Sequence, residues 1–107
     1  MRVEVEFTAR ARTMLVRWLA RRMPNPDDAY PLAVVYVEAA TGVMMSSQGR
    51  PDGAVKRTRG DGAEWWWQYL NGVWWVYTLT DSKRWFRPTV RRVRVFACVP
   101  SPPRPAA

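Results

Sequence analysis

Aromatic and arginine side chains are the residues whose type and spacing point to a chemistry, and that chemistry is binding. Seven tryptophans occur in 107 residues, and those at 65–67 and 74–75 lie on the two sides of an Asn71-Gly72 pair. Tryptophan offers a large apolar ring and one N–H donor, and the arginine guanidinium holds anions and stacks on rings. Rings interleaved with guanidinium groups suit nucleic acid, whose bases stack while its phosphates are held.

The Asn71-Gly72 pair, between two runs rich in aromatic and β-branched residues, predicts a β-hairpin with a two-residue loop. Such a loop fixes the register, and cross-strand partners share a face of the sheet. One face then carries Trp66, Gln68, Leu70, Val73, Trp75, Tyr77 and Leu79. We assign this more aliphatic face to the core. The opposite face carries the set that we call the aromatic platform, which is predicted to bind a partner: Trp65, Trp67, Tyr69 and Trp74.

Basic residues form the second part of the predicted binding surface. The net charge is +8, which favours a polyanionic partner, either nucleic acid or an acidic protein or nucleoprotein surface. A composition biased towards arginine is the other explanation, because Lys56 and Lys83 are the only lysines. The candidate residues come from a loop, from the last strand and from a helix: Lys56, Arg57, Arg59, Arg91, Arg92, Arg94, Arg10, Arg17 and Arg21. Arginine stacked on tryptophan within the fold is the structural alternative.

Residues that commonly carry catalysis are scarce. The chain has no histidine, its single cysteine is Cys98, and its only adjacent acidic pair is Asp27-Asp28 in a proline-rich connector. A lone cysteine on a strand is more often a small buried hydrophobe than a nucleophile, and it forms no zinc cluster. No glycine-rich phosphate loop is present. We therefore expect no enzymatic activity, no cofactor and no metal.

One enzyme class remains as a hypothesis. The opening strand, the helix start Thr8-Ala9-Arg10-Ala11-Arg12 and the order of the later strands resemble small ribonuclease toxins, some of which use Arg, Lys and Tyr in place of His. The resemblance implies RNA cleavage without a catalytic histidine. Where such toxins often carry arginine in the hairpin, this chain carries Trp74 and Trp75.

The pattern of apolar residues predicts the elements that position these side chains. Strict alternation over residues 2–7 predicts a half-buried strand. Thr8 then caps a helix that ends at about Met23, before Pro24. This helix packs one face on the sheet through Ala11, Leu15, Trp18 and Leu19.

The remaining segments are predicted as strands and loops. Residues 32–47 favour a hairpin turning at 39–42, although a buried helix over 32–45 also fits the spacing. Residues 46–63 read as one long loop. A last strand over 89–99 places Val93, Val95, Ala97 and Val99 on one face, opposite Arg92, Arg94, Phe96 and Cys98.

Together these segments predict an α+β fold: a mostly antiparallel sheet of about five or six strands with one N-terminal helix on one face. Residues 1–99 form a single domain, and residues 100–107 a flexible proline-rich tail. No apolar run of membrane-spanning length and no signal peptide are apparent, so a cytoplasmic location is expected, with no membrane partner.

The leading functional hypothesis is a small basic binding protein without enzymatic activity that engages a polyanionic surface. The alternative is an inhibitor or adaptor of the kind that phages and mobile elements encode, which acts by protein–protein contact. The toxin-like ribonuclease is the third.

Overall fold

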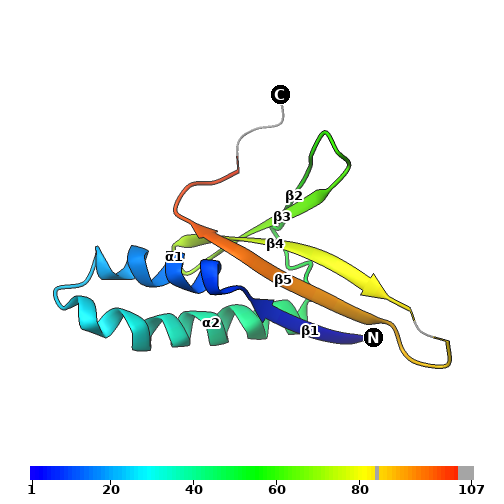
Figure 1. Cartoon of the computed structure of the whole chain (residues 1–107), viewed down its shortest axis with the longest axis horizontal. Coiled ribbons are helices and arrows are strands. Elements are labelled where there is room, and N and C mark those ends of the chain that lie inside the picture. The colour runs from blue at the N-terminus through cyan, green and yellow to red at the C-terminus, as the bar shows by residue number, and fades with distance from the viewer. Residues whose placement is uncertain (84, 104–107) are drawn as a thin grey trace.

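The computed structural model describes residues 1–83 and 85–103. A five-stranded sheet, in the order β1-β5-β4-β3-β2, carries two helices on one face (Figure 1). The elements are β1 (Arg2–Phe7), α1 (Ala9–Ala20), a short 3₁₀ turn (Pro26–Asp28), α2 (Ala29–Ser46), β2 (Val55–Thr58), β3 (Glu64–Leu70), β4 (Val73–Ser82) and β5 (Val90–Val99). Among the strands that the structure describes, β1 and β5 alone pair in parallel. The predicted α+β class with a mostly antiparallel sheet is therefore confirmed.

Helix α1 begins as predicted. The Ala11 N–H donates to the Thr8 hydroxyl oxygen at 3.2 Å, which satisfies one of the free donors of the first turn. The residues buried against the sheet are Ala11, Leu15 and Leu19. The helix ends at Ala20, before the expected Met23, and the connector to α2 therefore begins earlier than predicted.

Helix α2 overturns the hairpin predicted over residues 32–47, and the helical alternative is the correct one. Its buried residues, Ala29, Ala33, Ala40 and Met44, fall at helical spacing and pack into the core. The β-branched valines of this segment disfavour a helix only weakly, so tertiary packing overrides their strand preference. Two helices therefore cover the sheet, in place of the single helix expected.

The segment Pro26–Ser46 is also long and apolar enough to cross a membrane by length and composition, with 22% of its apolar window buried. Mostly buried core helices of water-soluble proteins also meet these two criteria, whereas most of this window is not buried. The expectation that no apolar run reaches spanning length is not met on these two criteria. Isolated polar residues interrupt the run, but the mean hydropathy of the segment remains high.

The loop predicted over residues 46–63 contains a strand. β2 pairs antiparallel with β3, from Val55 opposite Trp67 to Thr58 opposite Glu64. The turn between these strands uses Gly62 at a φ of 85°, a backbone conformation that glycine adopts without strain. A four-residue strand with two charged side chains carries too weak a pattern to identify from sequence.

The central hairpin has the predicted register. Leu70 pairs with Val73, Tyr69 with Trp74, and the pairing continues without a shift to Trp66 opposite Tyr77. The face assigned to the core is buried: Val73, Trp75 and Tyr77 have no exposed surface. The remaining prediction, a flexible tail over 100–107, falls partly on residues 104–107, which lie outside the described residues.

A bulge in β5 changes the alternation predicted for the last strand. Val76 pairs with Ala97 and Tyr77 pairs with Val95, so Phe96 is the extra residue. An extra residue reverses the side-chain alternation beyond it. Three residues are displaced from their predicted faces at this end: Cys98 enters the core, whereas Ala97 pairs with Val76 and Val99 with Trp74 on the other face.

Candidate nucleic-acid interface

The face of the sheet opposite the two helices, which we call the open face, holds the residues of the predicted binding surface. Because Trp67 pairs with Val76 and Tyr69 with Trp74, all four members of the aromatic platform lie on this face. The two hollows on the sheet's basic half are lined by no helix residue. The rings of the platform remain partly exposed themselves, with Tyr69 at 53%, so the described chain does not bury the platform.

The aromatic platform is built from ring contacts. Tyr69 lies 5.4 Å from Trp74 between ring centroids, and Trp65 lies 5.1 Å from Phe96. The three platform tryptophans are half-buried, and Tyr69 is more than half exposed. A shallow hollow of about 580 Å³ runs beside this end of the sheet, lined by Arg57, Trp65, Trp67, Val99 and residues 100–103. The rings thus contact neighbouring rings on one side and remain partly exposed to solvent on the other.

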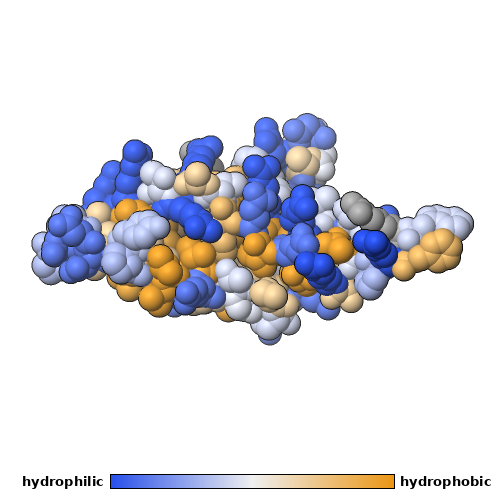
Figure 2. Space-filling model, turned by 60° about the horizontal axis from the view of Figure 1, so that its bottom comes forward, coloured by the Kyte–Doolittle hydropathy of each residue, from blue (hydrophilic) through white to orange (hydrophobic). Residues whose placement is uncertain are grey.

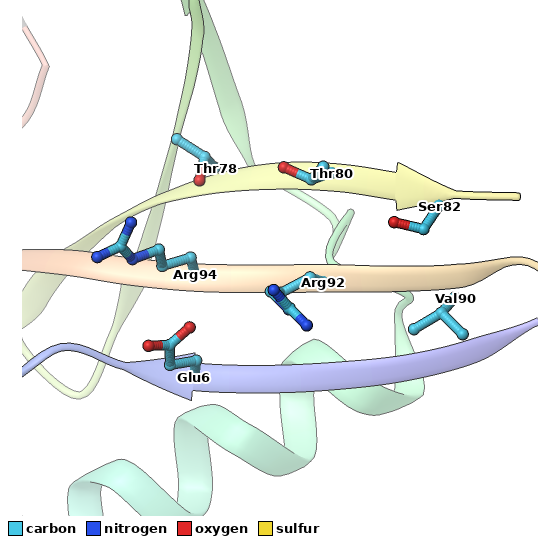
Figure 3. Close-up of a pocket in the computed structure, with 7 residues that line it drawn as sticks. All are labelled: Glu6, Thr78, Thr80, Ser82, Val90, Arg92 and Arg94. Carbon is cyan, nitrogen blue, oxygen red and sulfur yellow. The ribbon is translucent and has the colours of Figure 1, made fainter.

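Arginines and hydroxyl groups occupy the next part of the open face (Figure 3). The arginine hollow, about 240 Å³ in volume, is lined by Glu6, Thr78, Thr80, Ser82, Val90, Arg92 and Arg94. Thr78 pairs with Arg94 and Thr80 with Arg92, so hydroxyl and guanidinium groups alternate side by side. These groups donate hydrogen bonds of the kind that phosphate oxygens accept.

The ion pairs of this region leave part of its charge available. Arg92 lies 3.7 Å from Glu4, and both side chains remain exposed. No described carboxylate lies within 4.0 Å of the Arg94 guanidinium. Exposed ion pairs contribute little energy and give way readily to a competing anion.

Of the three predicted loop residues, two lie beside the platform. Arg57 pairs with Trp65 across the strands, and the Arg59 guanidinium carbon lies 4.6 Å from the centre of the Trp65 ring. Lys56 belongs to the opposite face, where it lies 5.9 Å from the Trp66 ring and pairs with Glu64 at 3.7 Å. Arginine stacked on tryptophan within the fold, the structural alternative to a binding role, is therefore present at Trp65.

Arg91 is separated from the other strand arginines. It is buried on the helix side, and its Nε and Nη2 donate to the two carboxylate oxygens of Asp81 at 2.7 and 2.9 Å. Its Nη1 donates to the Gln48 carbonyl at 3.1 Å. The hydrogen bond from Arg91 holds the pKa of Asp81 below its ordinary value. Arg91 ties β5 to β4 and to the end of α2, and it does not face the arginine hollow.

The predicted helix arginines form a separate patch. Arg10 and Arg17 are exposed on α1, and Arg21 is exposed directly after its end. Arg17 and Arg21 line a hollow of about 240 Å³ together with Trp18, Met14, Cys98 and Pro100. This patch lies on the helix-bearing side of the sheet, so it does not extend the platform.

Sequence reasoning missed the β4–β5 connection. Trp85 and Phe86 are 88% and 96% exposed, and their rings contact each other at 5.3 Å. Residues 85–89 lie at one end of the molecule, beyond β4 and before β5 (Figure 1). The signal in the sequence was a pair of aromatics outside any alternating run, close to Pro88, where no strand or helix is predicted to cover them.

The buried ionisable groups of the core lie away from this surface. Burial raises the pKa of the Cys98 thiol to about 12 and raises that of the Tyr77 phenol, whose hydroxyl donates to the Gly49 carbonyl at 2.8 Å. Within residues 1–83 and 85–103, no three His, Cys, Asp or Glu side chains are grouped to hold a metal ion. What the open face offers is stacking, hydrogen bonding and positive charge.

Comparisons with protein-family models, with curated proteins and with solved structures find no match to this chain. The functional argument therefore starts from the geometry of the open face.

Proposed function

We propose that this protein binds nucleic acid through the open face of its sheet, without catalysing a reaction. One observation carries the proposal: a single uncovered face brings the aromatic platform next to Arg92 and Arg94. Bases stack on flat rings, and guanidinium groups donate hydrogen bonds to phosphate oxygens. The rings and the arginines of this face therefore match the base and the phosphate of a nucleotide. The net charge of +8 also accelerates encounters with a polyanion.

The arrangement has the energetic properties that such binding needs. Stacking of one base on an aromatic side chain is worth about 1–3 kcal/mol by alanine substitution. The platform rings are held by Phe96 and by one another, so little side-chain freedom is lost when a base stacks on them. Phosphate contacts by arginine add affinity that falls with salt concentration.

The salt dependence of binding tests the proposal. We expect a labelled oligonucleotide to bind with a log K that falls linearly with log salt, and Arg94→Gln to reduce that slope by about 0.7. The matched control is Arg17→Gln, which removes the same charge from the exposed patch on α1 and should leave the slope nearly unchanged. Binding that is absent in the wild type, or equal slope changes in both variants, would contradict the proposal.

Incubation with RNA during the same measurements addresses the ribonuclease hypothesis. A binding protein leaves the RNA intact over hours. Cleavage that disappears in an Arg94→Gln variant would favour the toxin-like enzyme instead.

The outer side of α2 supports a second candidate function, contact with another protein. Tyr30, Val34, Val35 and Met45 are exposed there, and a hollow of about 230 Å³ opens beside them between α1 and α2. Figure 2 shows hydrophobic side chains gathered on the helix-bearing side. α2 contains no basic residue, so this surface differs in kind from the open face. Exposed apolar patches of this type mark interaction sites.

A Val35→Asp variant separates the two candidates. If α2 is the functional surface, the variant loses a discrete protein partner that the wild type recovers from nuclease-treated lysate, and it keeps its oligonucleotide affinity. If the open face is the functional surface, recovery of nucleic acid is unchanged by Val35→Asp and is lost on nuclease treatment.

A further inference from the structure

The exposed pair Trp85–Phe86 at the end of the molecule is unexplained by the fold. These are the two most exposed of the large hydrophobic side chains in the described chain. They contact each other edge to face at 5.3 Å with an interplanar angle of 79°, so they present one joint aromatic surface. Apolar surface of this size held in water is unfavourable unless a ligand covers it.

The base of this loop is continuous with the arginine hollow. A second hollow, of about 400 Å³, is lined by Arg2, Glu4, Ser82, Arg87, Pro88, Val90 and Arg92. Three of these residues, Ser82, Val90 and Arg92, also line the arginine hollow. The loop residue Arg87 therefore continues the row of guanidinium groups that begins at Arg94.

The open face consequently has an order along its length. Trp65 and Phe96 stand at one end, Arg94 and Arg92 follow, and the loop that carries Trp85 and Phe86 lies beyond Ser82 at the other end (Figure 1). From Thr78 to Ser82 a strand rises about 13 Å, so the rings at the two ends are separated by more than one nucleotide. Along β4 and β5 the side chains of the open face are therefore first aromatic, then basic, then aromatic again.

We infer that the ligand of the open face is a single-stranded nucleic acid that runs along β4 and β5 and stacks bases at both ends, on the aromatic platform and on Trp85–Phe86. This inference rests on the proposed function and names its substrate class. In a duplex the bases are paired and stacked inside, so rings at two separate points have no base face to contact. A single strand offers bases at both ends and phosphates over Arg92, Arg94 and Arg87 between them.

Oligonucleotide length provides the test. A strand of about 3 nucleotides reaches only one end of the track, whereas one of about 12 nucleotides spans it even with stacked spacing of about 3.4 Å. The variant is Trp85→Ala combined with Phe86→Ala, and both side chains are exposed, so the fold should be retained. The matched control is Tyr30→Ala, which removes an exposed aromatic ring from α2.

We expect the double variant to bind the long oligothymidylate at least about 10-fold more weakly than the wild type, and the short one with unchanged affinity. Tyr30→Ala should bind both like the wild type. A duplex of the longer length should bind more weakly than the single strand at the same salt concentration.

Three results would overturn the inference. One is an unchanged affinity of the double variant for the long strand while Trp67→Ala weakens it, a result that leaves the proposed function intact. Another is equal affinity for duplex and single strand. The third is loss of binding to vesicles of anionic phospholipid by the double variant with oligonucleotide binding unchanged, which would make the loop a membrane contact. Failure of the wild type to bind any oligonucleotide would instead remove the proposed function itself.

Discussion

The two faces of the sheet hold the same residue types in different surroundings. Trp74 and Trp75 are neighbours on β4, yet Trp75 is fully buried against Phe7 at 5.5 Å, and Trp74 is half-buried beside Tyr69. The alternation of a strand sends successive side chains to opposite faces. A count of tryptophans therefore says little about binding until each ring has been assigned to a face.

The arginines of β5 repeat this contrast. Arg91 is buried and bound to Asp81 on the helix side, whereas Arg92 and Arg94 line the arginine hollow. A buried guanidinium whose charge is matched by a carboxylate contributes to the fold and offers nothing to an external phosphate. The net charge of +8 thus overstates the charge that a ligand meets at this site.

Removing one tryptophan from each face is the strongest test of the comparison. We expect Trp75→Ala to lower the free energy of unfolding by about 3–5 kcal/mol, because it leaves a large cavity under α1. Trp67→Ala should cost about 1 kcal/mol or less, since its ring is only half-buried. Urea denaturation followed by circular dichroism measures both. Similar losses for the two variants would mean that the platform is a second core.

Replacing the arginines of β5 should give a smaller difference in unfolding free energy, again with the larger loss on the buried side. Arg91→Met removes two hydrogen bonds to Asp81 and one to the Gln48 carbonyl, and we expect a loss of about 1–2 kcal/mol in unfolding free energy. Arg94→Met should change stability by less than about 0.5 kcal/mol and weaken oligonucleotide binding. The same denaturation series measures stability. A stable Arg91→Met variant with weakened binding would place Arg91 in the site.

These contrasts explain why part of the structure was predictable from sequence. The Asn71-Gly72 loop encodes the register locally, so the faces of the central hairpin follow from two residues. The strand over residues 2–7 and the Thr8 cap are equally local signals. Each of these features depends on neighbours in sequence, and each is present in the structure.

The features that were missed depend on distant contacts. α2 is helical because its alanines pack against α1 and β1, and a window of sequence that contains valines does not reveal those partners. The bulge at Phe96 exists only in the pairing of β5 with β4. Alternation in β5 already separates Arg91 from Arg92, but the carboxylate partner of Arg91, Asp81, lies ten residues away in the chain.

The Asp81–Arg91 pair also predicts a dependence of stability on pH. The hydrogen bond from Arg91 lowers the folded-state pKa of Asp81 below the ordinary 3.8. Its contribution is therefore complete above pH 3.8 and is lost as the pH falls through the lower folded-state pKa. We expect Asp81→Asn to be less stable than the wild type at pH 7, with the difference shrinking below about pH 4. Urea midpoints over this range measure it, and a difference that is constant down to pH 2 would contradict the assignment.

The smallest expected effect concerns Cys98, whose face is set by the bulge. Burial raises its pKa to about 12, so at pH 8 almost no thiolate is present, and thiolate is the reactive form. We expect a thiol reagent to label the folded protein only as fast as it unfolds, and to label it rapidly in urea.

A Cys98→Ser variant carrying Ser101→Cys is the matched control, because residue 101 is exposed three positions further on, and it should react at once. Rapid labelling of the folded wild type would contradict the burial of Cys98 beneath the hollow that Arg17 and Arg21 line.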